Sequence, residues 1–332
     1  MDVSELGEFG LIERLRAALP APSGRVAIGV GDDAAVWAAD EGFALATTDT
    51  VVAGVHFLPD AVAWRDVGWK SLAVNVSDIA AMGGTPSVAL VTLCLPPATS
   101  VDAVDELYAG IADCARAHEI DVAGGDIVSA PVLTITVALY GTAGRRDDGT
   151  PRVLRRDAAS VGDPIAVTGP LGGSAGGLRA LREQASGDAA TALVARQMRP
   201  RPRIDAGRAA LDAGVRCAID ISDGLVQDLG HVCEASGVGA TVELARLPLD
   251  AALVELYPID ARMLAATGGE DYELILVAPE DVLAATGAAL GAQLAIIGRI
   301  TEDRGVRLLD EDGHEIDVAA GGWDHLKPSG PA

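Results

Sequence analysis

The sequence is poor in aromatic residues and lacks the motifs of several common enzyme classes. Phe, Trp and Tyr make up only 3% of the 332 residues, so the core must consist mainly of Ala, Val, Leu and Ile. The five histidines form no HExxH motif and show no zinc-ligand spacing. The cysteines form no CxxC pair, which indicates buried free thiols in a reducing compartment. They are Cys94, Cys114, Cys217 and Cys233.

The chain also lacks the features of an exported or membrane-bound protein. Its first residues, Met1 to Glu8, are acidic, and no apolar segment follows them, which argues against a signal peptide. The longest apolar runs, such as Ser87–Pro96, are too short to span a bilayer. We therefore expect a cytoplasmic protein with no membrane partner.

Positive charge is scarce. Lys and Arg number 25 against 48 Asp and Glu, which gives a net charge of -23. Such a surface repels a phosphate backbone, so a nucleic-acid partner is not expected. A solvated surface explains most of the carboxylates. It does not explain why several Asp residues stand beside Gly, Ser or Thr within apolar stretches.

Length and patterning predict two domains of mixed secondary structure. A chain of 332 residues with 49% hydrophobic residues is long enough for two compact cores. Helical and strand patterns alternate irregularly, which favours an α+β or mixed α/β fold over a regular parallel barrel. The segment Gly144–Pro151 is charged and turn-forming. We therefore predict domains at residues 1–147 and 148–332.

Two glycine-rich segments invite a nucleotide-binding interpretation. Gly29–Ala34 matches GxGxxA after a predicted strand, but Asp32 and Asp33 would place carboxylates where a pyrophosphate should lie. No GxxxxGK[ST] motif occurs, which excludes a P-loop enzyme. Gly169–Gly177 lies between a predicted strand and a predicted helix. This loop could aim amides at a phosphate or allow close helix packing, and the motif does not decide between them.

Acidic segments recur along the chain. A buried carboxylate is costly unless it is paired or bound to a cation, and Lys and Arg are sparse around these segments. Oxygen ligands without Cys or His favour magnesium. Any one Asp could instead cap a helix or occupy a turn. The whole set predicts several Mg²⁺ ions. The segments are Gly31–Asp33, Thr47–Asp49, Asn75–Asp78, Gly124–Asp126 and Asp220–Gly224.

Read in order, these motifs resemble the thiamine-monophosphate kinase family, within the aminoimidazole-ribonucleotide-synthetase-like superfamily of ATP-using enzymes. The elements Gly-Val-His-Phe and Gly-Gly-Glu-Asp-Tyr-Glu-Leu resemble the thiamine kinases rather than their relatives. The similarity covers nearly the whole chain. It runs through Gly7–Phe9, Gly31–Ala34, Thr48–Phe57, Ala73–Gly83, Gly124–Asp126, Asp220–Leu225, Gly268–Leu274 and Trp323–His325.

The resemblance implies a homodimer that phosphorylates thiamine monophosphate with ATP to give thiamine diphosphate. An N-terminal α/β domain would bind ATP and magnesium and dimerise through its sheet. A C-terminal α+β domain would complete the ATP and thiamine-phosphate sites. The acceptor is itself an ionised phosphate, so no general base is required, and Mg²⁺ ions would neutralise and align the two polyanions.

The resemblance also implies roles for individual residues. Arg155 and Arg156 are adjacent, so a shift of one residue in matching this chain to the family would assign the ATP contact to Arg155 instead of Arg156. The magnesium ligands would be Asp33, Thr47, Thr48, Asp49, Asp78, Asp126, Asp220 and Asp223. The ATP contacts would be Tyr108, Gly125, Asp126, Arg156 and Ser222. The thiamine-phosphate contacts would be His56, Glu270 and Trp323.

Several of these side chains also have structural interpretations, and two other functions remain open. Tyr108 and Trp323 could be packed aromatics, His56 a packed strand-end histidine and Glu270 a surface residue in a salt bridge. The protein could be another ATP-using enzyme of the superfamily. It could also be a non-catalytic regulator that binds a nucleotide or a thiamine phosphate.

Overall fold

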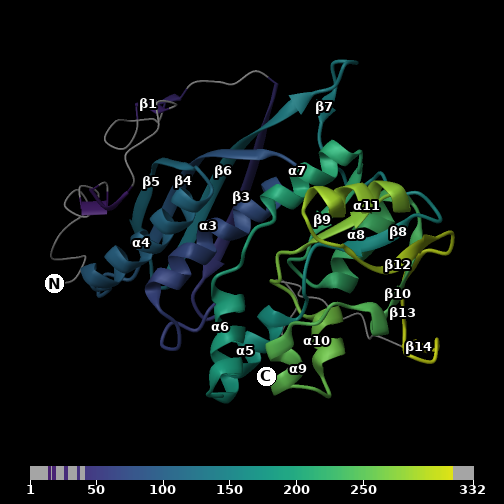
Figure 1. Cartoon of the computed structure of the whole chain (residues 1–332). Helices are drawn as coiled ribbons and strands as arrows, with labels where there is room; N and C mark the ends of the chain where they lie inside the picture. The colour runs from purple at the N-terminus through teal and green to yellow at the C-terminus, as the bar shows by residue number, and fades with distance from the viewer. Residues whose placement is uncertain (1–13, 16, 20–25, 29–35, 38–41, 317–332) are drawn as a thin grey trace. The chain divides into compact units, whose positions relative to one another are not determined.

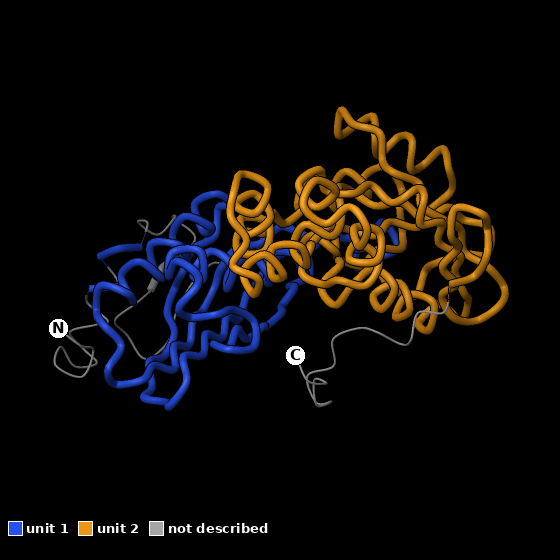
Figure 2. The backbone as a smooth tube through the Cα atoms, turned by 90° about the horizontal axis from the view of Figure 1, so that it is seen from below, with its two compact units in different colours: residues 1–79, 84–153 blue, residues 80–83, 154–332 orange. Residues whose placement is uncertain are grey.

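The computed structural model describes residues 14–15, 17–19, 26–28, 36–37 and 42–316. The chain divides into two compact units, residues 1–79 with 84–153 and residues 80–83 with 154–332 (Figure 2). The expected division was at 147/148, within Gly144–Pro151. In the structure this segment connects two paired strands, with Gly144 opposite Arg152. It is therefore a hairpin inside the first unit rather than a linker.

The first unit contains a sheet with the strand order β3-β6-β4-β5, and β7 extends β6. Helices α3 and α4 lie over one face of this sheet (Figure 1). The strands are β1 (Val26–Ile28), β2 (Val36–Trp37), β3 (Phe43–Val52), β4 (Thr85–Leu95), β5 (Asp121–Ser129), β6 (Thr134–Arg145) and β7 (Pro151–Arg152), and the helices are α3 (Trp64–Ala81) and α4 (Val101–Ala117).

Local sequence explains most of these elements. Every second residue of β6 is buried, as expected for a strand with one face against the core. Ser100 caps α4 by accepting a hydrogen bond from the amide of Ala103 at 3.2 Å. Helix α3 ends at Ala81, and Gly83 follows with φ +67°, a conformation that favours glycine. The amphipathic pattern of Glu5–Leu19, followed by Pro20, predicts a further helix, which lies largely outside the described residues.

Strand β5 was not predicted, because its Gly-Gly-Asp centre has low strand propensity. Pairing with β4 makes it a strand, and Leu90, Val91 and Thr92 lie opposite Gly124, Gly125 and Asp126. A Cβ on Gly125 would lie 1.7 Å from the carbonyl oxygen of Val91, so this close approach requires glycine.

The second unit is built on a seven-stranded sheet with the order β14-β13-β10-β12-β8-β11-β9. All neighbouring pairs are antiparallel except β10 with β13. The strands are β8 (Pro164–Val167), β9 (Cys217–Asp220), β10 (Gly239–Glu243), β11 (Leu274–Val277), β12 (Ala295–Thr301), β13 (Gly305–Leu309) and β14 (Glu315–Ile316). The helices are α5 (Gly173–Glu183), α6 (Asp188–Met198), α7 (Ile204–Ala213), α8 (Leu225–Ser236), η1 (Leu244–Arg246), α9 (Ala251–Leu256), α10 (Ala261–Thr267) and α11 (Glu280–Ala289).

The central strands of this sheet are buried on both faces. Ile219 and Ile275 join one core cluster with residues of α8 and α10. Ala218 and Leu276 join another cluster with residues of α7 and α11. Because neighbours along a strand point to opposite faces, the sheet has a core on each side. The predicted mixed α/β class is confirmed, and the four cysteines are free.

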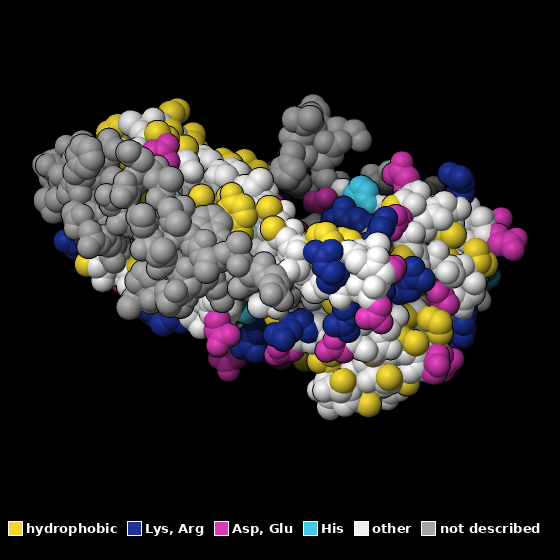
Figure 3. Space-filling view, turned by 90° about the horizontal axis from the view of Figure 1, so that it is seen from above, with side chains coloured by type: hydrophobic (Ala, Val, Ile, Leu, Met, Phe, Trp, Pro, Cys, Tyr) yellow, Lys and Arg dark blue, Asp and Glu magenta, His cyan; other side chains and the backbone are white. Residues whose placement is uncertain are grey.

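Charged side chains of both signs lie on the described surface. On the face shown in Figure 3, Lys and Arg side chains alternate with Asp and Glu and form no continuous basic patch among the described residues. No helix in the described part of the chain is long and apolar enough to cross a membrane.

Candidate active site

In the first unit, polar side chains of β3 and α3 meet. We call Thr47, Asp49, Asn75 and Asp78 the first acidic cluster. The hydroxyl of Thr47 donates to Oδ2 of Asp78. The buried Asn75 accepts from the amide of Asp49 through Oδ1 at 3.0 Å, and its Nδ2 donates to the carbonyl of Ser71 at 3.1 Å. Hydrogen bonds between β3 and α3 thus join the backbone of Asp49 to Asn75 and the carboxylate of Asp78 to Thr47.

Strand alternation separates other predicted ligands from this cluster. Thr47 and Asp49 share the face of β3 that carries the buried Val51, whereas Thr48 is exposed on the opposite face. Asp126 lies on β5, and β5 and β3 are at opposite ends of the sheet order. The three strand spacings that separate β3 from β5 amount to roughly 14 Å.

The register also places Asp126 on the opposite face from Asp49. Thr92 of β4 is opposite both Asp126 and Thr136, and Thr136 is opposite Thr50 on β3. Since directly paired residues share a face, Asp126 lies on the face of Thr50. Within one copy of the chain, the register therefore places Asp126 three strands from Asp49 and on the opposite face, and its role as a magnesium ligand stays a prediction.

His56 lies in the turn that follows β3. Its Nδ1 accepts a hydrogen bond from the amide of Val52 at 3.0 Å, so in the neutral ring the proton is on Nε2. The His56 carbonyl accepts from Nζ of the buried Lys70 at 3.2 Å. His56 is half-buried, and this backbone anchoring leaves its ring with a defined donor.

Two predicted ATP contacts in this unit have evident packing roles. Tyr108 is only 7% exposed, on the buried face of α4, and burial raises the pKa of its phenol. Gly125 is required by the approach of Val91 described above. Asp33, Trp323 and the whole GxGxxA segment, Gly29–Ala34, lie outside the described residues. The strand before that segment is described at Val26–Ile28.

In the second unit, a loop between β9 and α8 carries the second acidic cluster, which we define as Asp220, Asp223 and Asp228. Oδ2 of Asp228 accepts from the amides of Ser222, Asp223 and Gly224, each at 3.0 Å. Burial, followed by the nearby carboxylates of Asp220 and Asp223, raises the pKa of Asp228 to about 7. Gathered carboxylates of this kind fit a hard divalent cation such as Mg²⁺.

Exposure differs within this second cluster. Asp220 and Asp228 are each 2% exposed, whereas Asp223 is half-buried. Nε2 of Gln227 donates to Oδ2 of Asp223 at 3.2 Å. Ligand atoms of Asp223, Asp228 and the exposed His231 all lie within 4.8 Å of one another. Asp223 is therefore the carboxylate of this loop that is best placed to meet an ion from solvent.

The segment Gly268–Glu273 lies against this loop. The amide of Glu270 donates to the carbonyl of Ser222 at 2.8 Å, and the amide of Tyr272 donates to the carbonyl of Ile221 at 2.9 Å. Glu270 has φ +67° and Tyr272 φ +52°, which is uncommon for residues other than glycine. The predicted ATP contact Ser222 and the predicted acceptor contact Glu270 are thus hydrogen-bonded neighbours.

Asp271 decides between the two interpretations of the loop Gly169–Gly177. Its carboxylate accepts from the amides of Gly172 at 2.6 Å and Ser174 at 3.1 Å, so these amides at the start of α5 are already bonded. A Cβ on Gly177 would lie 2.2 Å from the carbonyl oxygen of Leu193. The loop therefore serves close packing. Burial raises the pKa of Asp271 to about 7.

The two adjacent arginines differ in their partners. Arg155 forms an ion pair with Asp157, with Nε 2.7 Å from Oδ1. Arg156 is exposed, and its carbonyl accepts from the hydroxyl of Ser236 at 2.9 Å. No residue in the described part of the chain bonds the Arg156 guanidinium. Arg156 is therefore the better candidate for an anionic ligand.

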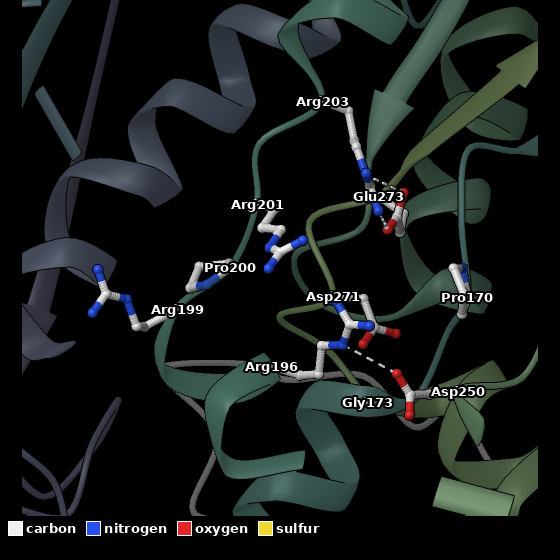
Figure 4. Close-up of a pocket in the computed structure, with 10 residues that line it drawn as sticks. All are labelled: Pro170, Gly173, Arg196, Arg199, Pro200, Arg201, Arg203, Asp250, Asp271 and Glu273. Carbon is white, nitrogen blue, oxygen red and sulfur yellow. Dashed lines mark hydrogen bonds and ion pairs between the residues drawn. The ribbon is translucent and has the colours of Figure 1, made fainter. Parts of the chain in front are cut away.

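A pocket in the second unit lies beside Asp271 (Figure 4). Nε of Arg196 donates to Asp250 at 3.2 Å, and Nε of Arg203 donates to Glu273 at 2.7 Å. The side chain of Arg201 lies next to Pro200, to the left of Arg203 and Asp271 in Figure 4. The pocket is lined by Pro170, Gly173, Arg196, Arg199, Pro200, Arg201, Arg203, Asp250, Asp271 and Glu273. Two of its four arginines, Arg196 and Arg203, are thus bonded to carboxylates of the same pocket.

Sequence reasoning gave no role to Asp228 or Asp271. Asp228 follows Gly224 by four residues, and an acidic residue in a first helical turn is a common capping signal. Asp271 stands inside the conspicuous Gly268–Leu274 motif, but its partner Gly172 is 99 residues away. Only the contact of Asp228 with the amides before α8 could have been found from local sequence.

Comparison with known proteins gives a consistent result over most of the chain. Residues 31–143 match the family of the AIR synthase related protein, N-terminal domain, and residues 160–311 match its C-terminal domain. The thiamine-monophosphate kinase of Escherichia coli (strain K12) is 38% identical over 333 residues, which cover 96% of this chain and 98% of the relative.

Two solved structures are similar over nearly their whole length. The thiamine-monophosphate kinase from Stenotrophomonas maltophilia K279a has a TM-score of 0.81 at 38% identity and covers 93% of this chain and 98% of its own. AaThiL complexed with AMPPCP and TMP has a TM-score of 0.77 at 34% identity and covers 98% and 99%.

Proposed function

The chain belongs to the thiamine-monophosphate kinases among the AIR synthase related proteins, and we propose that it phosphorylates thiamine monophosphate with ATP to give thiamine diphosphate and ADP. Transfer of the γ-phosphoryl group is direct and in line, without a covalent enzyme intermediate. The relative solved with AMPPCP and TMP supports a site for an ATP-like and a phosphorylated ligand together.

The observation that supports the mechanism is that each unit contains a cluster of acidic side chains with hydrogen bonds to neighbouring side chains or amides. Asp49 and Asp78 would hold Mg²⁺ at the first acidic cluster, and Asp220 and Asp223 at the second. Bound Mg²⁺ supplies charge neutralisation and alignment of the phosphates. Asp126 would serve a separate position, because it lies on the other face of its sheet.

The remaining roles follow from the chemical group that each predicted contact residue carries. Nε2–H of His56 would donate to the acceptor phosphate, and the Arg156 guanidinium would offset charge on ATP. Glu270 would contact the thiamine part of the acceptor, next to Ser222 at the nucleotide. Homodimerisation through the first sheet and a cytoplasmic location remain predictions from the sequence.

The direct test is a product assay with the purified protein, ATP and Mg²⁺. Addition of thiamine monophosphate is expected to release ADP and thiamine diphosphate in equal amounts. Free thiamine is expected to be a poor substrate, because it lacks the acceptor phosphate. Binding of both ligands without ADP release would favour the non-catalytic regulator, and ADP release with a different acceptor only would favour another enzyme of the superfamily.

A further inference from the structure

The start of helix α8 has the geometry of an anion site, but the protein fills it with its own carboxylate. Three consecutive amides, those of Ser222, Asp223 and Gly224, converge on one oxygen of Asp228 at 3.0 Å each. Consecutive amides before a helix commonly bind a phosphate oxygen. Here they are already satisfied, so these amides do not serve a nucleotide phosphate while Asp228 is in place.

The same contact fixes the path of the loop. Gly224 has φ +126°, and a Cβ there would lie 2.7 Å from the carbonyl oxygen of Thr267. The loop is therefore confined between α10 on one side and Asp228 on the other. The three amides donate to one side-chain oxygen and need no water as an acceptor, so a single contact holds the backbone of three consecutive residues.

The carbonyl groups of the same loop bind the segment that contains Glu270. The carbonyl of Ser222 accepts from the amide of Glu270 at 2.8 Å, while the amide of Ser222 donates to Asp228. A shift of Ser222 would therefore move both the predicted nucleotide contact and the predicted acceptor contact. Asp223 would turn with it, because its own amide is bonded to Asp228.

We infer that Asp228 is a positioning residue for phosphoryl transfer, which holds Ser222 and Asp223 in the orientation that receives magnesium-bound nucleotide. This inference rests on the proposed function and adds to it a residue that does not itself need to touch substrate. Residues that orient metal ligands commonly change metal affinity or activity by about 10- to 100-fold when they are replaced.

The main experiment compares Asp228→Ala with Asp228→Asn in the full-length protein. Asp228→Ala removes the acceptor, and we expect the Mg²⁺ concentration for half-maximal rate and the KM for ATP to rise by about 10- to 100-fold. The amide oxygen of Asp228→Asn can accept the same amides, so this variant should recover most of the loss.

The matched control is Asp188→Ala. Asp188 also occupies the first turn of a helix, α6, but it is exposed, and it should behave as wild type. Thermal unfolding of each variant separates stability from function. A lower midpoint in Asp228→Ala with unchanged ATP and Mg²⁺ parameters would show a merely structural role and overturn the inference, as would equal loss in Asp228→Ala and Asp228→Asn. Absence of activity in wild type would instead reject the proposed function.

Discussion

The first acidic cluster is held by side chains that project from a strand and a helix, whereas the second is held by backbone amides of a loop. In the first, the Thr47 hydroxyl bonds Asp78, and Asn75 bonds the amide of Asp49. In the second, Asp228 alone accepts three successive amides. Both arrangements organise carboxylates that would otherwise repel one another.

The difference indicates where each cluster is vulnerable. Regular elements keep their positions when one polar contact is lost, so changes in the first cluster should affect ligand chemistry more than the backbone path. The second cluster depends on a loop whose shape comes from a few hydrogen bonds. Changes there should alter the orientation of several groups together.

The largest expected effect is in the first cluster. Asp78→Asn removes a predicted magnesium ligand while keeping its size, and we expect kcat/KM to fall by about 10²- to 10³-fold with little change in thermal stability. The steady-state rate as a function of Mg²⁺ concentration measures it. The control is Asp102→Asn on α4, whose side chain is 97% exposed. Preserved turnover with unchanged magnesium dependence would reject Asp78 as a ligand.

The second effect concerns the scaffold of the second unit. Glu273 is 4% exposed, bonds Arg203 and Thr168, and its carbonyl accepts from the amide of Ile221 beside the acidic loop. Arg203→Met leaves a buried carboxylate without its cation and should lower the free energy of unfolding by about 2–3 kcal/mol. Denaturant unfolding measures the loss.

The matched control for that change is the exposed pair of Arg246 and Glu243, 2.7 Å apart on the surface. Arg246→Met should change the free energy of unfolding by less than about 0.5 kcal/mol. If both substitutions have equal effects, the acidic loop does not depend on the Arg203–Glu273 pair.

Regular periodicity in the sequence predicted much of this fold. A glycine-rich run before Gly173 predicts a helix over Gly173–Glu183, which has the observed bounds. Gly83 and Gly84 predict the end of a helix over Trp64–Met82, and the observed helix ends one residue earlier, at Ala81. Strand β5 was missed, since Gly124, Gly125 and Asp126 form a strand only through pairing with β4. Long-range pairing of this kind leaves no local signal.

The candidate site shows the same limit. Acidic residues flanked by apolar ones could be recognised in the sequence, and alternation along β3 would already have separated Thr48 from Thr47 and Asp49. Asp126 lies on the opposite face of the sheet from Asp49, and this placement depends on the register of four strands. The contact of Asp271 with Gly172 depends on the folded chain, so neither could be derived from spacing.

A pH series tests the carboxylate that caps α5. Burial raises the pKa of Asp271 to about 7 in the folded protein, from an ordinary value of 3.8. Below the ordinary value the group is protonated in both states. As pH rises from there through 7, only the unfolded chain loses the proton readily, so the folded wild type loses stability relative to a variant that does not titrate.

Asp271→Asn should therefore be more destabilised relative to wild type at pH 5 than at pH 8, with the difference shrinking by about 2 kcal/mol. Denaturant unfolding at several pH values measures it, and Asp188→Asn is the exposed control. If the stability difference between wild type and Asp271→Asn stays constant from pH 5 to pH 8, Asp271 is ionised throughout this range. Its two amide partners would then stabilise the carboxylate more than burial destabilises it.

The smallest effect separates the two faces of β3. Thr47→Val removes the hydroxyl that donates to Asp78, and kcat/KM should fall by about tenfold, because the carboxylate loses its orientation but remains available to Mg²⁺. Thr50→Val is the matched control on the same strand. Its hydroxyl lies 2.8 Å from that of Thr136 on the opposite face, away from Asp78. If Thr50→Val loses as much activity as Thr47→Val, orientation of the Asp78 carboxylate is not the cause of the loss.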